Sequence, residues 1–219
     1  VGETAEGETL EVLPEQHLPG VTLVQGLAKG EKMDDVVRQA TELGVSRIVP
    51  FAAERSVVKL DAAKAAARVD RWRRVAAAAA QQSQRADVPE VHEVVPASAL
   101  PEVLADSAVL VCWEDATDAE GIAAAVERLA LSPSADVAVV VGPEGGLTAA
   151  EVSLLEAAGA VAVTLGATVL RTETAGVVPE VTEDAESYTG AAYIFIENAT
   201  GNNAIIVAPG AAGRVSVAD

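Results

Sequence analysis

The stretch VVVGPEGGLT, residues 139–148, decides the fold of this chain. Its β-branched apolar run predicts a buried strand that ends at Gly142. Thr148 and Glu151 have the spacing of a capping box, which predicts that a helix begins there. The glycines between them permit backbone conformations and close approaches that a Cβ forbids. Two interpretations stay open for this loop alone: an ordinary strand-to-helix turn, or a cradle whose outward-facing N–H groups hold a ligand.

Apolar strands alternate with amphipathic helices on both sides of this loop. This pattern indicates an α/β fold, with a parallel sheet that helices cover on both faces. Ligands are then expected at the carboxyl ends of the strands, where the opening loop lies. We predict strands at 21–27, 47–51, 91–95, 108–113, 136–142 and 161–165, and helices between Gly30 and Gly44, at 61–84, after Ser98, at 118–131 and at 149–158.

A second polar loop, residues 166–176, follows the last of these strands and contains Arg171-Thr172-Glu173-Thr174. Arg171 is the only basic residue between Arg128 and Arg214, so its place in an acidic region favours a functional role. A salt bridge between Arg171 and Glu173 is the structural alternative. After Val178 the alternation ends in acidic sequence, and residues 191–196 and 204–208 predict a β-hairpin.

The amino-acid composition is that of a globular protein and excludes several other classes of protein. Half of the 219 residues are hydrophobic, which is enough for a globular core. No run approaches the roughly 18 apolar residues of a membrane span and no leader precedes a cleavage site, so we expect a cytoplasmic protein without membrane contact. The single Cys112 excludes internal disulfides and a cysteine-rich zinc site. His17 and His92 stand in no ligand motif, so no metal is expected.

The net charge of −18 is distributed unevenly. Residues 21–100 carry 12 basic and 10 acidic side chains, whereas residues 101–219 carry 3 basic and 18 acidic ones. The basic side chains are therefore concentrated where a polyanion such as RNA can be met locally, despite the unfavourable overall field. A solvated surface of mixed charge is equally compatible with this count.

Seven sequence blocks occur in a specific order and at a specific spacing. They are residues 23–34, 40–45, 54–57, 71–72, 80–85, the loop 142–146, and 165–166 together with 170–175. On these blocks, the segment from about Gly20 to Gly176 resembles the bacterial 16S rRNA (uracil-N3)-methyltransferases. This is the ribosomal small subunit methyltransferase E family of the SPOUT superfamily.

The resemblance implies S-adenosyl-L-methionine as methyl donor, a C-terminal trefoil knot around its site, a homodimer, and 16S rRNA or the small ribosomal subunit as partner. The chemistry of this methyl transfer makes Arg171 and Glu173 the catalytic candidates: Arg171 to stabilise charge on the uracil carbonyls or to grip a phosphate, Glu173 to orient Arg171 or to accept the proton. The implied cofactor residues are Gly142, Pro143, Glu144, Gly145, Gly146, Leu165, Gly166, Leu170, Thr172 and Thr174. The candidates for RNA contact are Lys29, Lys32, Arg55, Arg71, Arg74 and Arg85.

The chain departs from the family pattern at both ends. We expect residues 1–19 to be a remnant of an N-terminal RNA-binding barrel or a linker, and residues 20–177 to form the methyltransferase domain. The family continues after Gly176 into an apolar helix, whereas this chain reaches Pro179, which is unfavourable inside a helix. Residues 178–219 then form an acidic linker and a hairpin tail that resembles a short piece of the ribokinase-type sugar kinases. The alternative function is therefore a truncated or mosaic β/α domain that binds cofactor or a partner without catalysis.

Overall fold

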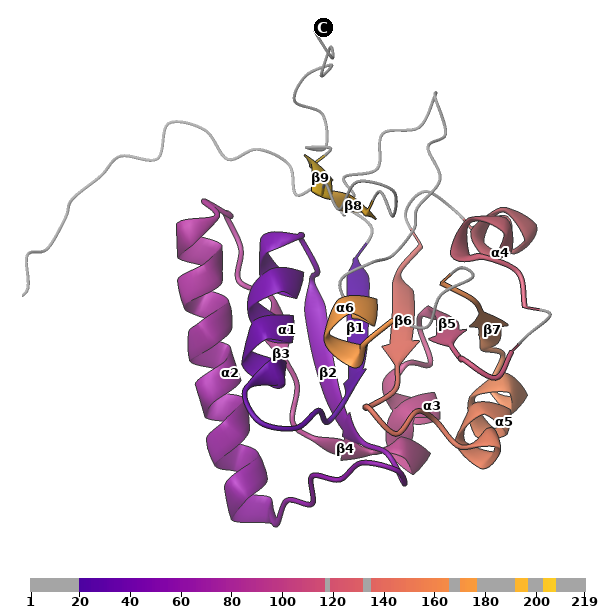
Figure 1. Cartoon of the computed structure of the whole chain (residues 1–219), viewed down its shortest axis with the longest axis horizontal. Coiled ribbons are helices and arrows are strands. Elements are labelled where there is room, and N and C mark those ends of the chain that lie inside the picture. Colours follow the sequence, from indigo (N-terminus) through magenta and orange to yellow (C-terminus); the bar gives the residue numbers. More distant parts are fainter. Residues whose placement is uncertain are drawn as a thin grey trace, which may run out of the picture.

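The computed structural model describes residues 20–116, 119–131, 135–165 and 170–176, and the backbone of two strands at 192–196 and 203–207. Figure 1 shows a sheet with helices packed around it. In chain order the elements are β1 (Val21–Gly26), α1 (Lys32–Glu42), β2 (Arg47–Ala52), α2 (Ala62–Gln82), β3 (Glu90–Val91), β4 (Val95–Pro96), a 3-10 turn (Ala97–Ala99), α3 (Leu100–Val103), β5 (Ala108–Cys112), α4 (Ile122–Arg128), β6 (Val137–Val141), α5 (Ala149–Ala157), β7 (Val161–Val163), α6 (Thr172–Ala175), β8 (Ala192–Ile196) and β9 (Asn203–Val207).

The main sheet is parallel throughout and has the strand order β3-β2-β1-β6-β5-β7, with β4 also paired to β2. The α/β fold with a parallel sheet is thereby confirmed. After β1 the chain adds β2 on one side of the sheet, and after β6 it adds β7 toward the opposite edge. The change of direction therefore falls between β1 and β6, and in such sheets ligands bind beyond the carboxyl ends of the strands near that point.

Alternate residues of the central strands pack on opposite faces. Leu23 of β1 lies in a core with Met33 of α1 and Trp72 of α2, all of them buried. The next residue, Val24, lies in a second core with residues of α3 and α5, including Leu155. Helices thus cover both faces of the sheet. This two-sided burial explains why β6 reads as a continuous apolar run.

The predicted helix ends match the structure where the capping chemistry is strong. The side chain of Asp61 accepts a hydrogen bond from the backbone N–H of Lys64 at 2.9 Å and begins α2. At α5, Thr148 Oγ1 accepts from the N–H of Glu151 at 3.2 Å, and Glu151 Oε2 accepts from the N–H of Thr148 at 2.9 Å. The predicted capping box is confirmed. It fixes where the loop 142–148 ends.

The strand expected at 91–95 is instead two strands of two residues each, β3 and β4. The cause is Pro50 in the neighbouring strand β2. The carbonyl of Ile48 accepts from the N–H of His92 on the β3 side, and Pro50, two residues later, faces the same side without an N–H to donate. The ladder is therefore interrupted between the two short strands.

Two predicted helix starts are wrong. Ser98 lies within the 3-10 turn, and the N-cap of the following helix α3 is Ala99, which has no side-chain cap. Helix α4 begins at Ile122 after Gly121, not at Asp118, which lies outside the described residues. The four-residue helix α6 was expected as part of a loop.

Other expectations concern residues that are only partly described. Strands β8 and β9 pair antiparallel, with Ala192 opposite Val207 and Ile196 opposite Asn203. Residues 1–19, 166–169 and 177–191 lie outside the described part of the chain. The trefoil knot and the N-terminal remnant depend on these segments and stay predictions.

The capping box generates a first testable prediction. Replacing Thr148 by Ala removes the acceptor for the Glu151 N–H, so the free energy of unfolding should fall by about 1 kcal/mol. Urea denaturation followed by circular dichroism measures this change. Ser153→Ala, an exposed position on the same helix, is the matched control and should change stability by less than about 0.5 kcal/mol. Equal effects of the two substitutions would contradict the capping role.

Candidate functional site

A cavity of about 530 Å³ opens at the carboxyl ends of β5, β6 and β7. Four parts of the chain line it: Lys32 at the start of α1, residues after β5 including Trp113, residues 141–144 and 146–147 at the end of β6, and residues after β7 including 170–173. Small-molecule sites typically have volumes of about 300–1,000 Å³. Both the size and the place in the sheet are therefore those of a ligand site.

Glycines in and near the loop 142–146 allow close backbone packing. A Cβ on Gly26 would lie 2.5 Å from the nitrogen of Pro143, and a Cβ on Gly145 would lie 2.8 Å from the carbonyl oxygen of Arg55. Gly146 has φ +69°, and a Cβ there would collide with the carboxylate of Glu114. The loop is thus held between β1, the turn at Arg55 and the end of β5. No larger residue fits these contacts without movement.

A buried hydrogen-bond chain joins three distant parts of the sequence. Gln25 Nε2 donates to Thr172 Oγ1 at 2.8 Å, and the Thr172 hydroxyl donates to the carbonyl of Gly142 at 2.6 Å. Gln25 is fully buried and Thr172 nearly so. Because the Thr172 proton goes to Gly142, its oxygen accepts from the amide, which fixes the amide orientation. The chain ties α6 to the ends of β1 and β6.

Lys32 joins the two loops by ion pairs. Its Nζ lies 3.2 Å from Glu144 Oε1 and 3.1 Å from Glu173 Oε2. Hydrogen bonds to Glu173 and then Glu144 raise the pKa of Lys32. Desolvation raises the pKa of each glutamate, but backbone hydrogen bonds and Lys32 outweigh it, so the pKa of Glu144 and that of Glu173 are lowered. All three groups are therefore charged at neutral pH.

Arg171 is exposed at the cavity wall. No ion pair joins it to a carboxylate in the described ranges 20–116, 119–131, 135–165 and 170–176, since Glu173 pairs with Lys32 instead. The alternative of an Arg171–Glu173 salt bridge is thus not what the structure shows. A cation without a close counter-ion beside a cavity can meet an anionic or electron-rich ligand.

Most of the predicted cofactor residues come together at this cavity. Gly145 does not line it, because it faces Arg55. Thr174 is half-buried and also lies outside the lining, and Gly166 is outside the described residues. The predicted residues that do line the cavity are Gly142, Pro143, Glu144, Gly146, Leu165, Leu170, Arg171, Thr172 and Glu173.

The six candidates for RNA contact divide into different environments. Lys29 and Arg74 are exposed, with no ion pair in the parts of the chain that the structure describes. Arg71 is exposed and pairs with Asp34, and Arg55 donates to the loop carbonyls of Gly145 and Leu147. Lys32, as shown above, is bound to two glutamates at the cavity. Of the six, Lys29 and Arg74 are the exposed ones whose side chains have no ion pair or loop contact in the described part of the chain.

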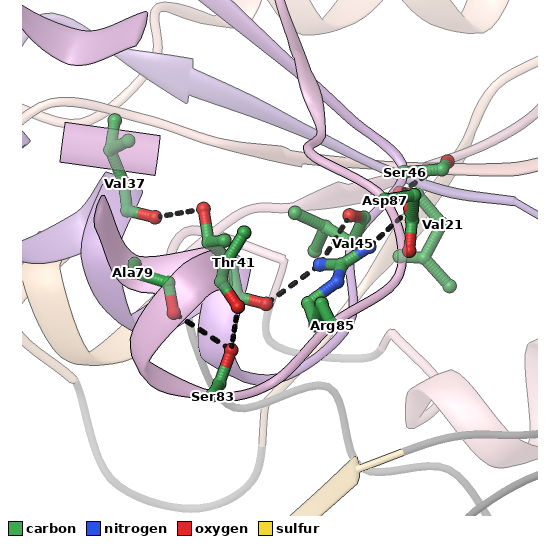
Figure 2. Close-up of polar contacts among 10 residues, drawn as sticks. Val21, Val37, Thr41, Val45, Ser46, Ala79, Ser83, Arg85 and Asp87 are labelled. Carbon is green, nitrogen blue, oxygen red and sulfur yellow. Dashed lines mark hydrogen bonds and ion pairs between the residues drawn. The ribbon is translucent and has the colours of Figure 1, made fainter. Parts of the chain in front are cut away.

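Arg85 has a structural position (Figure 2). Its Nη1 donates to the carbonyl of Thr41 at 2.7 Å and to that of Val45 at 3.0 Å, just where α1 ends. Its Nη2 lies 2.7 Å from Asp87, and only 13% of the side chain is exposed. We therefore correct the expectation for Arg85: the guanidinium satisfies helix-end carbonyls and is not available to a phosphate.

Sequence reasoning missed three residues of the site. Gln25 reads as an interior strand residue, and nothing in its neighbours indicates the contact with Thr172 across 147 positions. Trp113 and Glu114 line the cavity after β5. Their signal was present, because ligands bind beyond the carboxyl ends of parallel strands and the polar pair Glu114-Asp115 follows directly after one.

Two further classes of site were sought in the described ranges. No group of three or more His, Cys, Asp or Glu side chains there could hold a metal ion. In that same part of the chain, no helix combines the length and apolar character that crossing a membrane requires.

The buried hydrogen-bond chain generates a second prediction. Thr172→Val removes one of the two acceptors of the Gln25 amide, leaving the carbonyl of Gly26, and removes the donor to the Gly142 carbonyl. The free energy of unfolding should fall by about 2 kcal/mol, because each buried unsatisfied group costs about 1–3 kcal/mol. Thr172→Ser keeps the hydroxyl, so its free energy of unfolding in the same urea denaturation should stay close to that of wild type. If Val and Ser variants were equally stable, the hydroxyl would have no such role.

The ion pairs of Lys32 generate a third prediction, on pH dependence. The lowered pKa values of Glu144 and Glu173 contribute stability above their ordinary value of 4.5, which is lost as the pH falls below it. In Lys32→Met both carboxyls lose this partner. The stability difference between wild type and variant should therefore shrink between about pH 6 and about pH 3. Lys59→Met, at an exposed position, is the control. A difference that stays constant with pH would refute the coupling.

Known protein sequences are similar to this chain over the residues that form the sheet and the cavity. A family model described as an RNA methyltransferase domain matches residues 14–179. The Ribosomal RNA small subunit methyltransferase E of Mycobacterium bovis is 41% identical over 165 residues, which cover 73% of this chain and 61% of that protein. The protein of the same name from Bacillus subtilis is 39% identical over 157 residues, covering 71% of this chain and 61% of that protein. The chain thus spans about three-fifths of the length of these curated relatives.

Solved structures show the same architecture. A Ribosomal RNA small subunit methyltransferase E from Neisseria gonorrhoeae, bound to S-adenosyl methionine, superposes with a TM-score of 0.63 at 34% identity, over 73% of this chain and 63% of that one. A methyltransferase from Legionella pneumophila in complex with the same cofactor gives a TM-score of 0.63 at 29% identity, with the same coverage. The family match covers the whole sheet and both loops of the cavity. The chain therefore belongs to the RNA methyltransferase domain family.

Proposed function

We propose that this chain binds S-adenosyl-L-methionine and methylates N3 of a uridine in small-subunit (16S) ribosomal RNA. The observation that carries the proposal is the cavity at the ends of β5, β6 and β7, with its glycine-rich wall and the exposed Arg171. The names of the relatives support an rRNA substrate, and the two cofactor-bound neighbours support the methyl donor. The choice of uracil N3 rests on the resemblance of the sequence blocks.

The residues of the cavity fit this cofactor. The volume is adequate, and the wall offers backbone groups of Gly142, Pro143 and Gly146 on one side and of Leu165 and Leu170 on another. In addition, Nε1 of Trp113 is buried and has no hydrogen-bond partner in the part of the chain that the structure describes. An unpartnered buried donor beside a cavity is what a bound ligand with acceptor atoms would satisfy. When bound, S-adenosyl-L-methionine supplies a methyl group made electrophilic by its sulfonium.

The side chains at the rim have distinct tasks in this proposal. Arg171 stabilises the negative charge that develops on a uracil carbonyl as the N3 proton passes to solvent water. Glu173 is a weak base because its pKa is lowered, so we assign it to positioning: it holds Lys32 and attracts Arg171. Glu144, bound to Lys32 and to the backbone N–H of Lys29 at 3.0 Å, keeps the glycine-rich loop against the start of α1.

The surroundings of the cavity support an RNA partner. Lys29 follows β1 near the loop, and Arg71 and Arg74 lie on the exposed face of α2. We propose that Lys29, Arg71 and Arg74 contact rRNA phosphates and that Arg55 both supports the loop and meets the backbone. By the family resemblance we further propose a homodimer around the site and action in the cytoplasm, where the rRNA is found.

Two measurements test the proposed function. Calorimetric titration with S-adenosylhomocysteine should show binding, and absence of heat at millimolar ligand would overturn the proposal. A methylation assay on small ribosomal subunits that lack the modification should then show transfer of label from S-adenosyl-L-methionine. Binding without any transfer would instead favour the alternative, a β/α domain that binds cofactor without catalysis.

The role of Arg171 gives the fourth prediction. Arg171→Ala should lower kcat/KM for methylation about 100-fold or more, the usual cost of removing a group that stabilises developing charge. Binding of S-adenosylhomocysteine should change by less than about 3-fold, because backbone groups hold the cofactor in this proposal. Arg38→Ala, on the exposed side of α1, is the matched control. Unchanged turnover in Arg171→Ala would show that Arg171 has no catalytic task.

A further inference from the structure

Three glutamates line the cavity in the described part of the chain, and they are not equivalent. Glu144 and Glu173 share Lys32 as counter-ion, at 3.2 and 3.1 Å. Glu114 has neither a hydrogen bond nor an ion pair with any described residue, although its carboxylate lies against the backbone of Gly146. A carboxylate without a partner in a ligand cavity is an available acceptor for two hydrogen bonds.

The residue before Glu114 supplies the complementary group. Trp113 lines the same cavity, and its indole Nε1 is buried without a partner among the described residues. A buried donor of this kind costs stability unless something accepts its hydrogen bond. The end of β5 therefore offers both an acceptor and a donor to whatever occupies the cavity.

We propose that Glu114 binds the ribose hydroxyls of the adenosyl group, with Trp113 as the accompanying donor. This assignment rests on the proposed function and adds a specificity residue to it. A hydroxyl both donates and accepts, so a vicinal diol satisfies the carboxylate and the indole N–H together. An ammonium only donates and would leave the indole unpaired, and a sulfonium offers no hydrogen at all. A carboxylate that follows a parallel strand suits ribose hydroxyls because it can accept a hydrogen bond from each of them.

The glycine-rich loop makes room for this carboxylate. Gly146 has φ +69°, and the place where its Cβ would stand is taken by Glu114 Oε1. The missing side chain thus lets the carboxylate approach the loop backbone that forms the neighbouring wall. Glu114 and the loop are two sides of one binding surface, built from the ends of adjacent strands β5 and β6.

The test is a set of calorimetric titrations on wild type and Glu114→Gln. S-adenosylhomocysteine should bind Glu114→Gln about 10-fold or more weakly, because a charged acceptor is replaced by a neutral amide. The 2′-deoxy and 3′-deoxy analogues of the same ligand should bind wild type about 10-fold more weakly than the parent, but should lose less than about 3-fold in the variant. 5′-Methylthioadenosine, which keeps the ribose and lacks the amino acid, should be weakened by Glu114→Gln to the same extent as the parent.

Several results would overturn this assignment. An unchanged affinity of Glu114→Gln for S-adenosylhomocysteine would do so alone, and the proposed function would stand. If Glu114→Gln did not weaken the binding of 5′-methylthioadenosine, the carboxylate would lie against the ammonium of the parent ligand. If both proteins bound the deoxy analogues more weakly than the parent by the same factor, the carboxylate would lie against the base. Absence of binding to wild type would instead overturn the proposed function. Glu156→Gln, an exposed glutamate on α5, is the control and should bind as wild type does.

Discussion

The hydroxyl of Thr172 is the contact on which the rest of the site depends. It accepts from Gln25 on β1 and donates to the carbonyl of Gly142 at the end of β6. The chain arrives there after β7, which lies beyond β5 at the far edge of the sheet. Helix α6 nevertheless lies against α1, on the other side of β5 and β6 from β7 (Figure 1). Leu170, Arg171, Thr172 and Glu173 line the cavity together with the ends of β5 and β6.

In this strongly acidic chain, Arg171 at the cavity has no ion pair with any residue that the structure describes. Lys32 forms ion pairs with two of the three glutamates that line the cavity in the described ranges. Arg171 therefore keeps its charge for a partner that approaches from solvent. Because the field of the whole protein repels polyanions, this local arrangement matters more here than it would in a basic protein. Short-range contacts must supply the attraction that net charge does not.

Much of the fold was predictable from the sequence because it depends on local chemistry. The apolar runs at β1 and β6, the Asp61 cap of α2 and the capping box at Thr148 each act within a few residues. The split of the strand at 91–95 was not predictable from that segment, since its cause, Pro50, lies in a different strand.

The same distinction explains the site. The glycine-rich loop and Arg171 carry a recognisable sequence pattern, and both lie at the cavity. Lys32 and Arg85 look alike as exposed cations in the sequence, yet one binds two glutamates and the other the end of a helix. The two glutamates and the helix-end carbonyls are 40 or more positions away from these cations, so only tertiary structure assigns them. Gln25 remained unnoticed for the same reason, because its partner Thr172 is 147 positions away.

Pro50 has a consequence beyond the shape of one strand. A long, regular edge strand offers a row of free N–H and C=O groups on which a second chain can assemble, and this is a common route to aggregation. Here the edge beside β2 consists of two pieces of two residues each, and the opposite edge, β7, has only three residues. A highly apolar parallel sheet thus ends on both sides in strands too short to recruit another copy.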